Sequence, residues 1–212
     1  MDTKFQKFIN FNKILLLTIL ILKPIFSHAD QDRNNIKLSN NINLNLSKNW
    51  KIINQKTRET LKKKVDELIF LKISSSLPFA ANLYRNGRVI GIMNIRVYPN
   101  IEIYQNEIRK ISRDDLTFFD SELYKNVKKG VSLVGAKILH WKGSKLEIIN
   151  NKIYIVSNYN RSSINKNEAI FNVKLFRLLD GKKSFTLTLS YDEKFKNFML
   201  PEINKIAESI NY

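Results

Sequence analysis

Apolar and polar residues alternate along several short stretches of the chain, and this period of two predicts β-strands with one buried face. The alternation is clear at Ile42, Leu44 and Leu46, in a stretch at residues 42–50 that ends in Trp50 after a turn expected at 47–49. Asn86 and Gly87 join two further stretches, 80–84 and 89–97, through two residues that tolerate positive φ, which predicts a tight hairpin. More strands are expected at residues 134–141, 146–149, 153–159, 169–178 and 184–191, with breaks at 142–144, 150–151, 160–167 and 180–183.

Apolar residues recur every three or four positions in four other segments, which predicts helices. The expected helices span residues 55–73, 104–111, 114–129 and 193–210. Gly130 is expected to end the third helix, and Pro201 should kink the fourth or mark its start. The third helix carries an apolar stripe that we interpret as a core face rather than a ligand pocket: Phe118, Phe119, Leu123 and Val127.

Strands and helices are interleaved over residues 42–212, with no internal repeat and no second composition regime. A segment of this length can bury a core of its own. We therefore predict a single α+β domain in which an antiparallel sheet meander is flanked by helices.

The order of these elements resembles the PsbP-like fold, which the exported DcrB-like bacterial proteins share. The resemblance is carried by the strand ending in Trp50, the strand at 89–97, a helix, a meander with an inner turn at 150–154, and a last strand, Phe185 to Tyr191, that leads into a helix finishing in Ser209 and Ile210. The lysine-rich helix at 55–73 and Asn151, where the family often has a glycine, depart from the pattern. The resemblance implies an α-β-α sandwich and a non-catalytic role in binding or assembly, and it assigns no functional residue.

Residues 1–29 have the pattern of a cleavable secretory signal peptide. Lysines precede an uncharged apolar run at residues 14–22, and Ser27, His28 and Ala29 form a small-x-small cleavage site. The run is much shorter than the roughly 20 residues of a membrane-spanning helix, so we expect no anchor after cleavage. Residues 30–41 are polar and are expected to form a flexible leader. The sequence thus predicts a periplasmic or secreted protein.

The chain is strongly basic, with a formal charge of +17, which falls to +14 once four lysines and one aspartate leave with the signal peptide. Outside the cytoplasm such charge favours an acidic protein, an anionic lipid or an acidic polysaccharide over nucleic acid, although simple solvation of the lysines explains it equally well. The candidate contacts lie on the first helix, between the second and third helices, and in a polar loop expected at 158–163: Lys62, Lys63, Arg109, Lys110, Arg113 and Arg161.

Catalytic chemistry has few residues to draw on. The chain has no cysteine, and His140 is the one histidine left after cleavage, which excludes thiolate nucleophiles and metal sites built on several histidines. The densest acidic group is explained by the start of a helix without any chemistry: Asp114, Asp115, Asp120 and Glu122. No phosphate-binding glycine motif occurs, and we expect no cofactor and no metal.

Three hypotheses follow from these observations. The first is an exported, non-enzymatic binding or assembly protein of the bacterial envelope that acts through protein–protein contacts. The second is a peripheral binder of anionic lipid or polysaccharide, and the third is a hydrolase of an unrecognised type. The sequence leaves the partner, the oligomeric state and the spatial grouping of the basic residues open.

Overall fold

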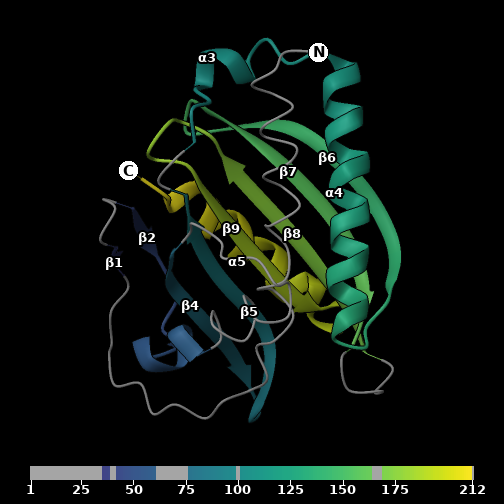
Figure 1. Cartoon of the computed structure of the whole chain (residues 1–212). Helices are drawn as coiled ribbons and strands as arrows, with labels where there is room; N and C mark the ends of the chain where they lie inside the picture. The colour runs from purple at the N-terminus through teal and green to yellow at the C-terminus, as the bar shows by residue number, and fades with distance from the viewer. Residues whose placement is uncertain (1–34, 39–41, 61–75, 99–100, 164–168, 212) are drawn as a thin grey trace.

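A seven-stranded antiparallel sheet forms the centre of the protein, as the alternation predicts (Figure 1). The computed structural model describes residues 35–38, 42–60, 76–98, 101–163 and 169–211. The strand order is β3-β4-β5-β9-β8-β7-β6, so the last strand is inserted between β5 and β8 and joins two parts of the chain. The strands are β3 (Trp50–Ile52), β4 (Ser76–Arg85), β5 (Arg88–Val97), β6 (Ile138–Ile149), β7 (Lys152–Ser162), β8 (Ile170–Leu178) and β9 (Phe185–Asp192).

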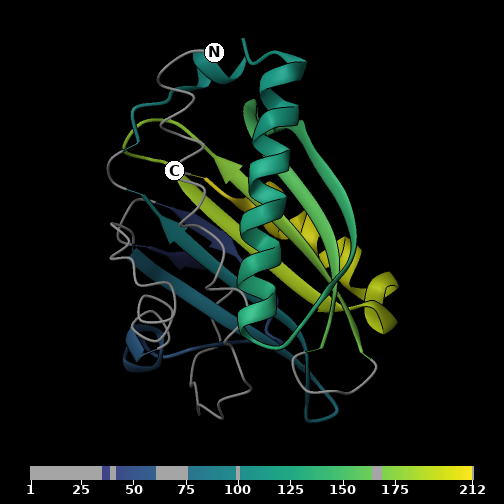
Figure 2. The same cartoon turned by 45° about the vertical axis from the view of Figure 1, so that its right-hand side comes forward.

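Helices cover both faces of this sheet, which gives the α-β-α sandwich that the element order implies (Figures 1 and 2). One face carries α4 (Arg113–Leu133), which follows the short α3 (Gln105–Ile108). The other carries α5 (Lys196–Ser209), which begins after a 3₁₀ turn, η2 (Glu193–Phe195). A small hairpin of β1 (Asn35–Lys37) and β2 (Asn43–Asn45) is fixed to the end of α5, because the Asn45 amide donates to Ser209 Oγ at 2.9 Å.

Successive side chains of β9, in the middle of the sheet, point to opposite faces, and the hydrophobic core therefore lies in two layers, one on each face. Phe185, Leu187 and Leu189 of β9 point toward α5, where they pack with Met199 and Ile203. The second layer lies under α4, whose buried stripe packs on β7 and β8 through these residues: Phe119, Leu123, Val127, Val131, Ile155, Tyr159, Val173 and Leu175. The predicted core stripe is therefore confirmed for Phe119, Leu123 and Val127, whereas Phe118 is exposed.

Paired residues with positive φ make the two tight hairpin turns that the sequence predicts. Asn86 and Gly87 have φ values of 49° and 74°, and they join β4 to β5. Asn150 and Asn151 have φ values of 50° and 60° and join β6 to β7. Positive φ at both central residues matches the right-handed twist of the flanking strands.

Several elements end at other residues than predicted, and in one case local composition did not distinguish a bulge from a turn. The break expected at 142–144 is a bulge within one long strand, β6, where Gly143 takes a φ of 84°. Gly130 lies inside α4, which runs to Leu133, and Gly135 with a φ of 76° follows its end. The strand expected at 42–50 is divided into β2 and β3 by the turn expected at 47–49, where the Trp50 amide donates to the Ser47 carbonyl at 3.1 Å.

Pro201, the polar leader and the lysine-rich helix each agree with the sequence prediction only in part. Pro201 lies inside α5, which begins before it at Lys196. Residues 35–37 of the expected flexible leader pair with β2 as β1, so at least this part of the leader is ordered. Residues 55–60 of the expected helix at 55–73 are helical, and the rest of that helix, like the signal peptide, lies outside the described residues.

Candidate functional site

Basic side chains from the sheet and from α5 line a groove of about 200 Å³, which we call the lysine groove. Its charged and amide side chains are four lysines, one glutamate and two asparagines: Lys142, Lys145, Lys174, Lys196, Glu147, Asn158 and Asn172. Four lysines against one glutamate leave a formal charge of +3 in a small concave space. Such a space favours an anionic group.

Strand register explains why these residues share one side of the sheet. Asn158 of β7 lies directly opposite Lys174 of β8. Lys145 and Glu147 are two residues apart on β6, so their side chains lie on the same face of the sheet. On α5, Lys196 is followed by Leu200 and Ile203 at spacings of four and three, which places one face of the helix over the groove.

One carboxylate serves two of the lysines. Glu147 Oε1 lies 3.0 Å from Lys145 Nζ, and Glu147 Oε2 lies 3.9 Å from Lys174 Nζ. Burial lowers the pKa of Lys174, Glu147 raises it, and the positive charge of Lys145 lowers it further. Lys174 Nζ also lies 4.6 Å from the centre of the Phe176 ring. The groove therefore holds a partly desolvated ammonium that an additional anion would stabilise.

Asn172 adds a hydrogen-bond donor that has no acceptor. Its side chain is buried, with 7% of its surface exposed, and Nδ2 has no hydrogen-bond partner. Asn160, directly opposite Asn172 on β7, likewise has a buried Oδ1 without a partner. Buried amide groups are nearly always paired, so the neighbouring Asn160 is itself an available acceptor, and Asn172 counts here as one polar residue of the groove lining.

The groove adjoins an open edge of the sheet. β6 contributes Lys142 and Lys145 to the groove, and among the described strands it pairs only with β7. Leu146 and Ile148 of β6 are exposed, Ile148 by 75%. An edge strand presents N–H and C=O groups that can pair with an added strand. The lysines of the groove can thus bind an anionic group next to the place where β6 can pair with an added strand.

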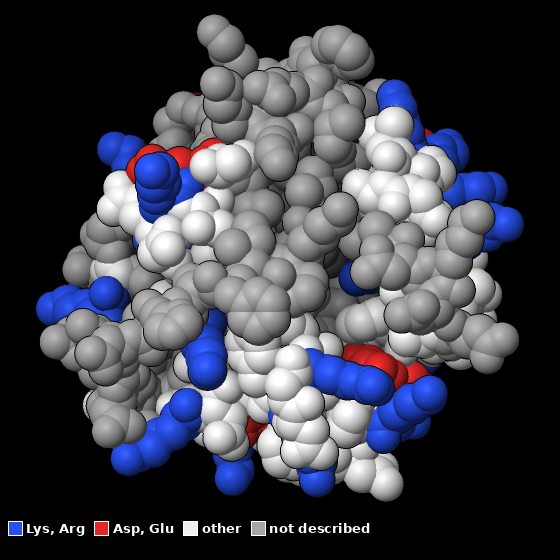
Figure 3. All heavy atoms as spheres, turned by 90° about the horizontal axis from the view of Figure 1, so that it is seen from below, with Lys and Arg blue, Asp and Glu red and all other residues white. Residues whose placement is uncertain are grey.

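The basic residues predicted from the sequence do not form this site. Arg109, Lys110 and Arg113 are exposed around the junction of α3 and α4. Lys62 and Lys63 lie outside the described residues. In the view of Figure 3, Lys and Arg side chains occupy several separate places around the margin of the molecule rather than one patch.

Arg161 is also placed differently from its prediction. The polar loop expected at 158–163 is the end of β7, and Arg161 is 2% exposed. Its guanidinium lies 4.8 Å from the centre of the Phe171 ring, and Nη1 donates to the Ser162 carbonyl at 2.9 Å. Residues 158–161 belong to a strand because their buried and partly exposed side chains continue the alternation of β7. The polar composition of the segment concealed this alternation in the sequence.

Residues that could support hydrolysis are dispersed. Asp120 Oδ2 accepts a hydrogen bond from Trp141 Nε1 at 2.9 Å, and Glu122 pairs with Lys125 at 2.7 Å. Asp114 and His140 are exposed on different elements. Within the described ranges no three His, Asp or Glu residues gather in a way that could hold a metal ion. The same part of the chain contains no helix that is both long and apolar enough to cross a membrane.

Comparisons with known proteins identify the fold. No protein-family model matches the chain, and no curated protein matches it. The solution structure of cyanobacterial PsbP from Synechocystis sp. PCC 6803 matches with a TM-score of 0.54 and 11% identity, over 89% of this chain and 99% of that one. The chain therefore has a PsbP-like fold, as its element order predicts.

Two other solved structures match less well. A protein from Bacteroides thetaiotaomicron gives a TM-score of 0.47 and 11% identity over 85% of this chain, which spans about half (48%) of that structure. LpqN, involved in cell envelope biogenesis of Mycobacterium tuberculosis, gives a TM-score of 0.40 and 12% identity, over 80% of this chain and 82% of that one.

Proposed function

We propose that this chain is an exported, non-enzymatic binding protein of the bacterial envelope that recognises an acidic segment of a partner protein at the lysine groove. The observation that carries the proposal is the convergence of four lysines on one concavity beside an edge strand. Export is supported by the signal-peptide pattern of residues 1–29.

The form of the site favours a protein segment over a membrane surface. A flat anionic membrane is recognised by a broad positive face. The lysine groove is instead narrow and concave, and it lies next to β6, whose outer edge can accept an added strand. An extended acidic segment would pair with β6 through its backbone and place carboxylates near Lys145 and Lys174.

Site-specific photo-crosslinking in the exported protein tests the proposal. A photoreactive residue in place of Leu200, which lines the groove and is partly exposed, should crosslink to a protein through an acidic segment. The double variant Lys145→Gln/Lys174→Gln should abolish that adduct. The same probe in place of Lys128 on α4, on the opposite face of the sheet, should not give the adduct.

The identity of the adduct and its dependence on charge decide the outcome. A lipid or polysaccharide adduct at Leu200 would support the peripheral-binder hypothesis in place of this one. A protein adduct that forms equally well without Lys145 and Lys174 would show that the groove does not recognise the partner by charge.

A further inference from the structure

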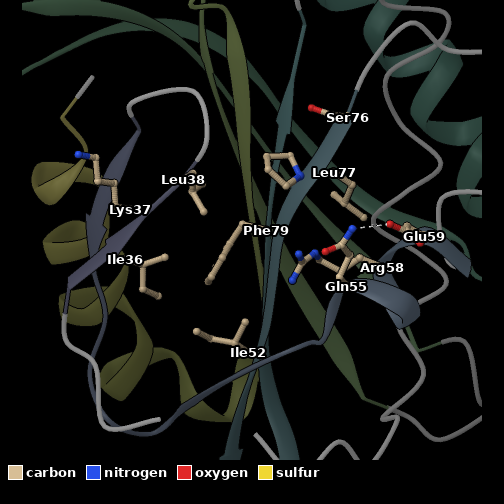
Figure 4. A pocket seen from close by; sticks show the side chains of 11 residues that line it. Ile36, Lys37, Leu38, Ile52, Gln55, Arg58, Glu59, Ser76, Leu77 and Phe79 are labelled. Atoms are coloured by element: carbon tan, nitrogen blue, oxygen red, sulfur yellow. Dashed lines mark hydrogen bonds between the residues drawn. The ribbon is translucent and has the colours of Figure 1, made fainter. Parts of the chain in front are cut away.

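A second cavity, separate from the lysine groove, lies between the β1–β2 hairpin and the β3–β4 edge of the sheet (Figure 4). Its volume is about 610 Å³, within the range of about 300–1,000 Å³ that is typical of small-molecule sites. Figure 4 shows Ile36 and Leu38 on the hairpin side, Phe79 and Ile52 between the two sides, and Leu77 and Arg58 opposite. We call it the hairpin pocket.

The walls of the hairpin pocket are continuous with the hydrophobic core. Leu38 and Phe79 are buried members of the α5-side core, and Ile36 and Ile52 pack against that core while remaining partly exposed. Leu77 of β4 extends the same apolar surface. Such a surface favours an alkyl chain, because each methylene that enters it leaves water.

The polar groups of the pocket come mainly from the helical residues 55–60. Arg58 Nη1 donates to the Ile53 carbonyl at 2.6 Å, while its buried Nε has no hydrogen-bond partner. Burial lowers the pKa of Arg58, and Glu59 opposes this. The Glu59 carboxylate accepts from Gln55 Nε2 at 2.7 Å, so part of its bonding capacity is already used (Figure 4).

Arg58 favours an anionic head group on the occupant. Among the charged residues of the described lining, Lys37 points away from the cavity (Figure 4), so Arg58 supplies the positive charge that faces it, and Glu59 is the acidic residue. A guanidinium with a free N–H matches the geometry of a carboxylate or phosphate. We propose that the hairpin pocket binds a single-chain amphiphile, with its alkyl chain against Ile36, Ile52 and Phe79 and its anionic head at Arg58.

Calorimetric titration of the full chain with four twelve-carbon probes tests this proposal: dodecanoate, dodecyl phosphate and dodecyltrimethylammonium, each below its micelle concentration, and dodecanol below its solubility limit. We expect one molecule of at least one anionic probe to bind per chain, at least tenfold more tightly than the cationic probe. Tighter binding of dodecanoate would identify a fatty acid, and tighter binding of dodecyl phosphate would identify a lipid phosphate.

Two variants and one control locate the bound probe. Ile36→Trp should fill the pocket and abolish binding, and Arg58→Gln should weaken the anionic probes about tenfold while leaving dodecanol unchanged. Lys56→Gln removes one positive charge from the same helical segment outside the lining and should change nothing. Unaltered anion affinity in folded Arg58→Gln protein, or no preference for anionic heads, would overturn the proposal.

Discussion

Replacing Arg177 by methionine is expected to stabilise the protein, because the arginine carries a charge into the core under α4. Arg177 is 1% exposed. Its Nη1 donates to Ser157 Oγ at 3.2 Å, but Nε and Nη2 have no hydrogen-bond partner. The guanidinium also lies 5.5 Å from the centre of the Phe119 ring. Methionine would keep most of the aliphatic packing and remove the charge.

The magnitude follows from the pKa of this group. Burial lowers the pKa of Arg177 from its ordinary value of 12.5 to about 10, although Tyr98, Tyr159 and Asp120 act in the opposite direction. At about 1.36 kcal/mol per pKa unit, keeping the group charged in the folded state costs about 3 kcal/mol. The folded and unfolded states are both protonated below pH 10, so the whole cost is present at neutral pH and is relieved only as the pH rises through that pKa.

Urea unfolding at pH 7, followed by tryptophan fluorescence, measures the effect. We expect Arg177→Met to raise the free energy of unfolding by about 1–3 kcal/mol, since the lost contacts with Ser157 and Phe119 offset part of the gain. Arg88→Met replaces an exposed arginine and should change it by less than about 0.5 kcal/mol. A loss of more than about 1 kcal/mol in Arg177→Met would refute the reasoning, because the contacts of the guanidinium would then outweigh its desolvation.

Three further substitutions test other parts of the fold by the same unfolding assay. Gly181→Ala should cost about 1–3 kcal/mol, because Gly181 has a φ of 59°, a conformation that alanine adopts only under strain, while the exposed Tyr104 ring can move away from the added Cβ; an unchanged midpoint would contradict this conformation. Phe119→Ala should cost about 3–5 kcal/mol, since this fully buried ring joins α4 to the sheet, and a loss below about 1 kcal/mol would mean that α4 is not docked there. Ser112→Ala should cost about 1 kcal/mol, because Ser112 Oγ accepts from the Asp115 amide at 3.0 Å as the N-cap of α4; no loss would show that the cap is replaced by water.

Local signals predicted much of the fold. The Asn86–Gly87 turn and the Asn150–Asn151 turn each fix a hairpin register through positive φ, and that preference depends on the turn residues themselves. Helix α4 was predicted because its apolar spacing persists over several turns. The boundaries were less predictable, because Gly143 has the same left-handed conformation in a bulge as glycine has in a turn.

The lysine groove was not predicted, because it depends on contacts that are distant in the sequence. Lys174 interrupts the apolar pattern of β8, which is a detectable signal, but nothing nearby identifies its neighbours. It meets Lys145 through the pairing of β6, β7 and β8, and it meets Lys196 because β9 carries the chain to α5 beside it. Arg161 is the opposite case, a predicted contact residue that is not available at the surface. The polar composition around it predicted a surface loop, but the alternation of β7 buries its side chain.

Binding of an acidic peptide to the full chain tests the central claim most directly. Fluorescence anisotropy with a labelled glutamate-rich decapeptide should show binding that weakens sharply between low and physiological salt. Lys145→Gln/Lys174→Gln should weaken it at least tenfold, whereas Lys128→Gln/Lys129→Gln, which removes the same charge from α4, should leave it nearly unchanged. Equal losses in the two double variants would contradict the account, because the peptide would then be responding to net charge and not to the lysine groove.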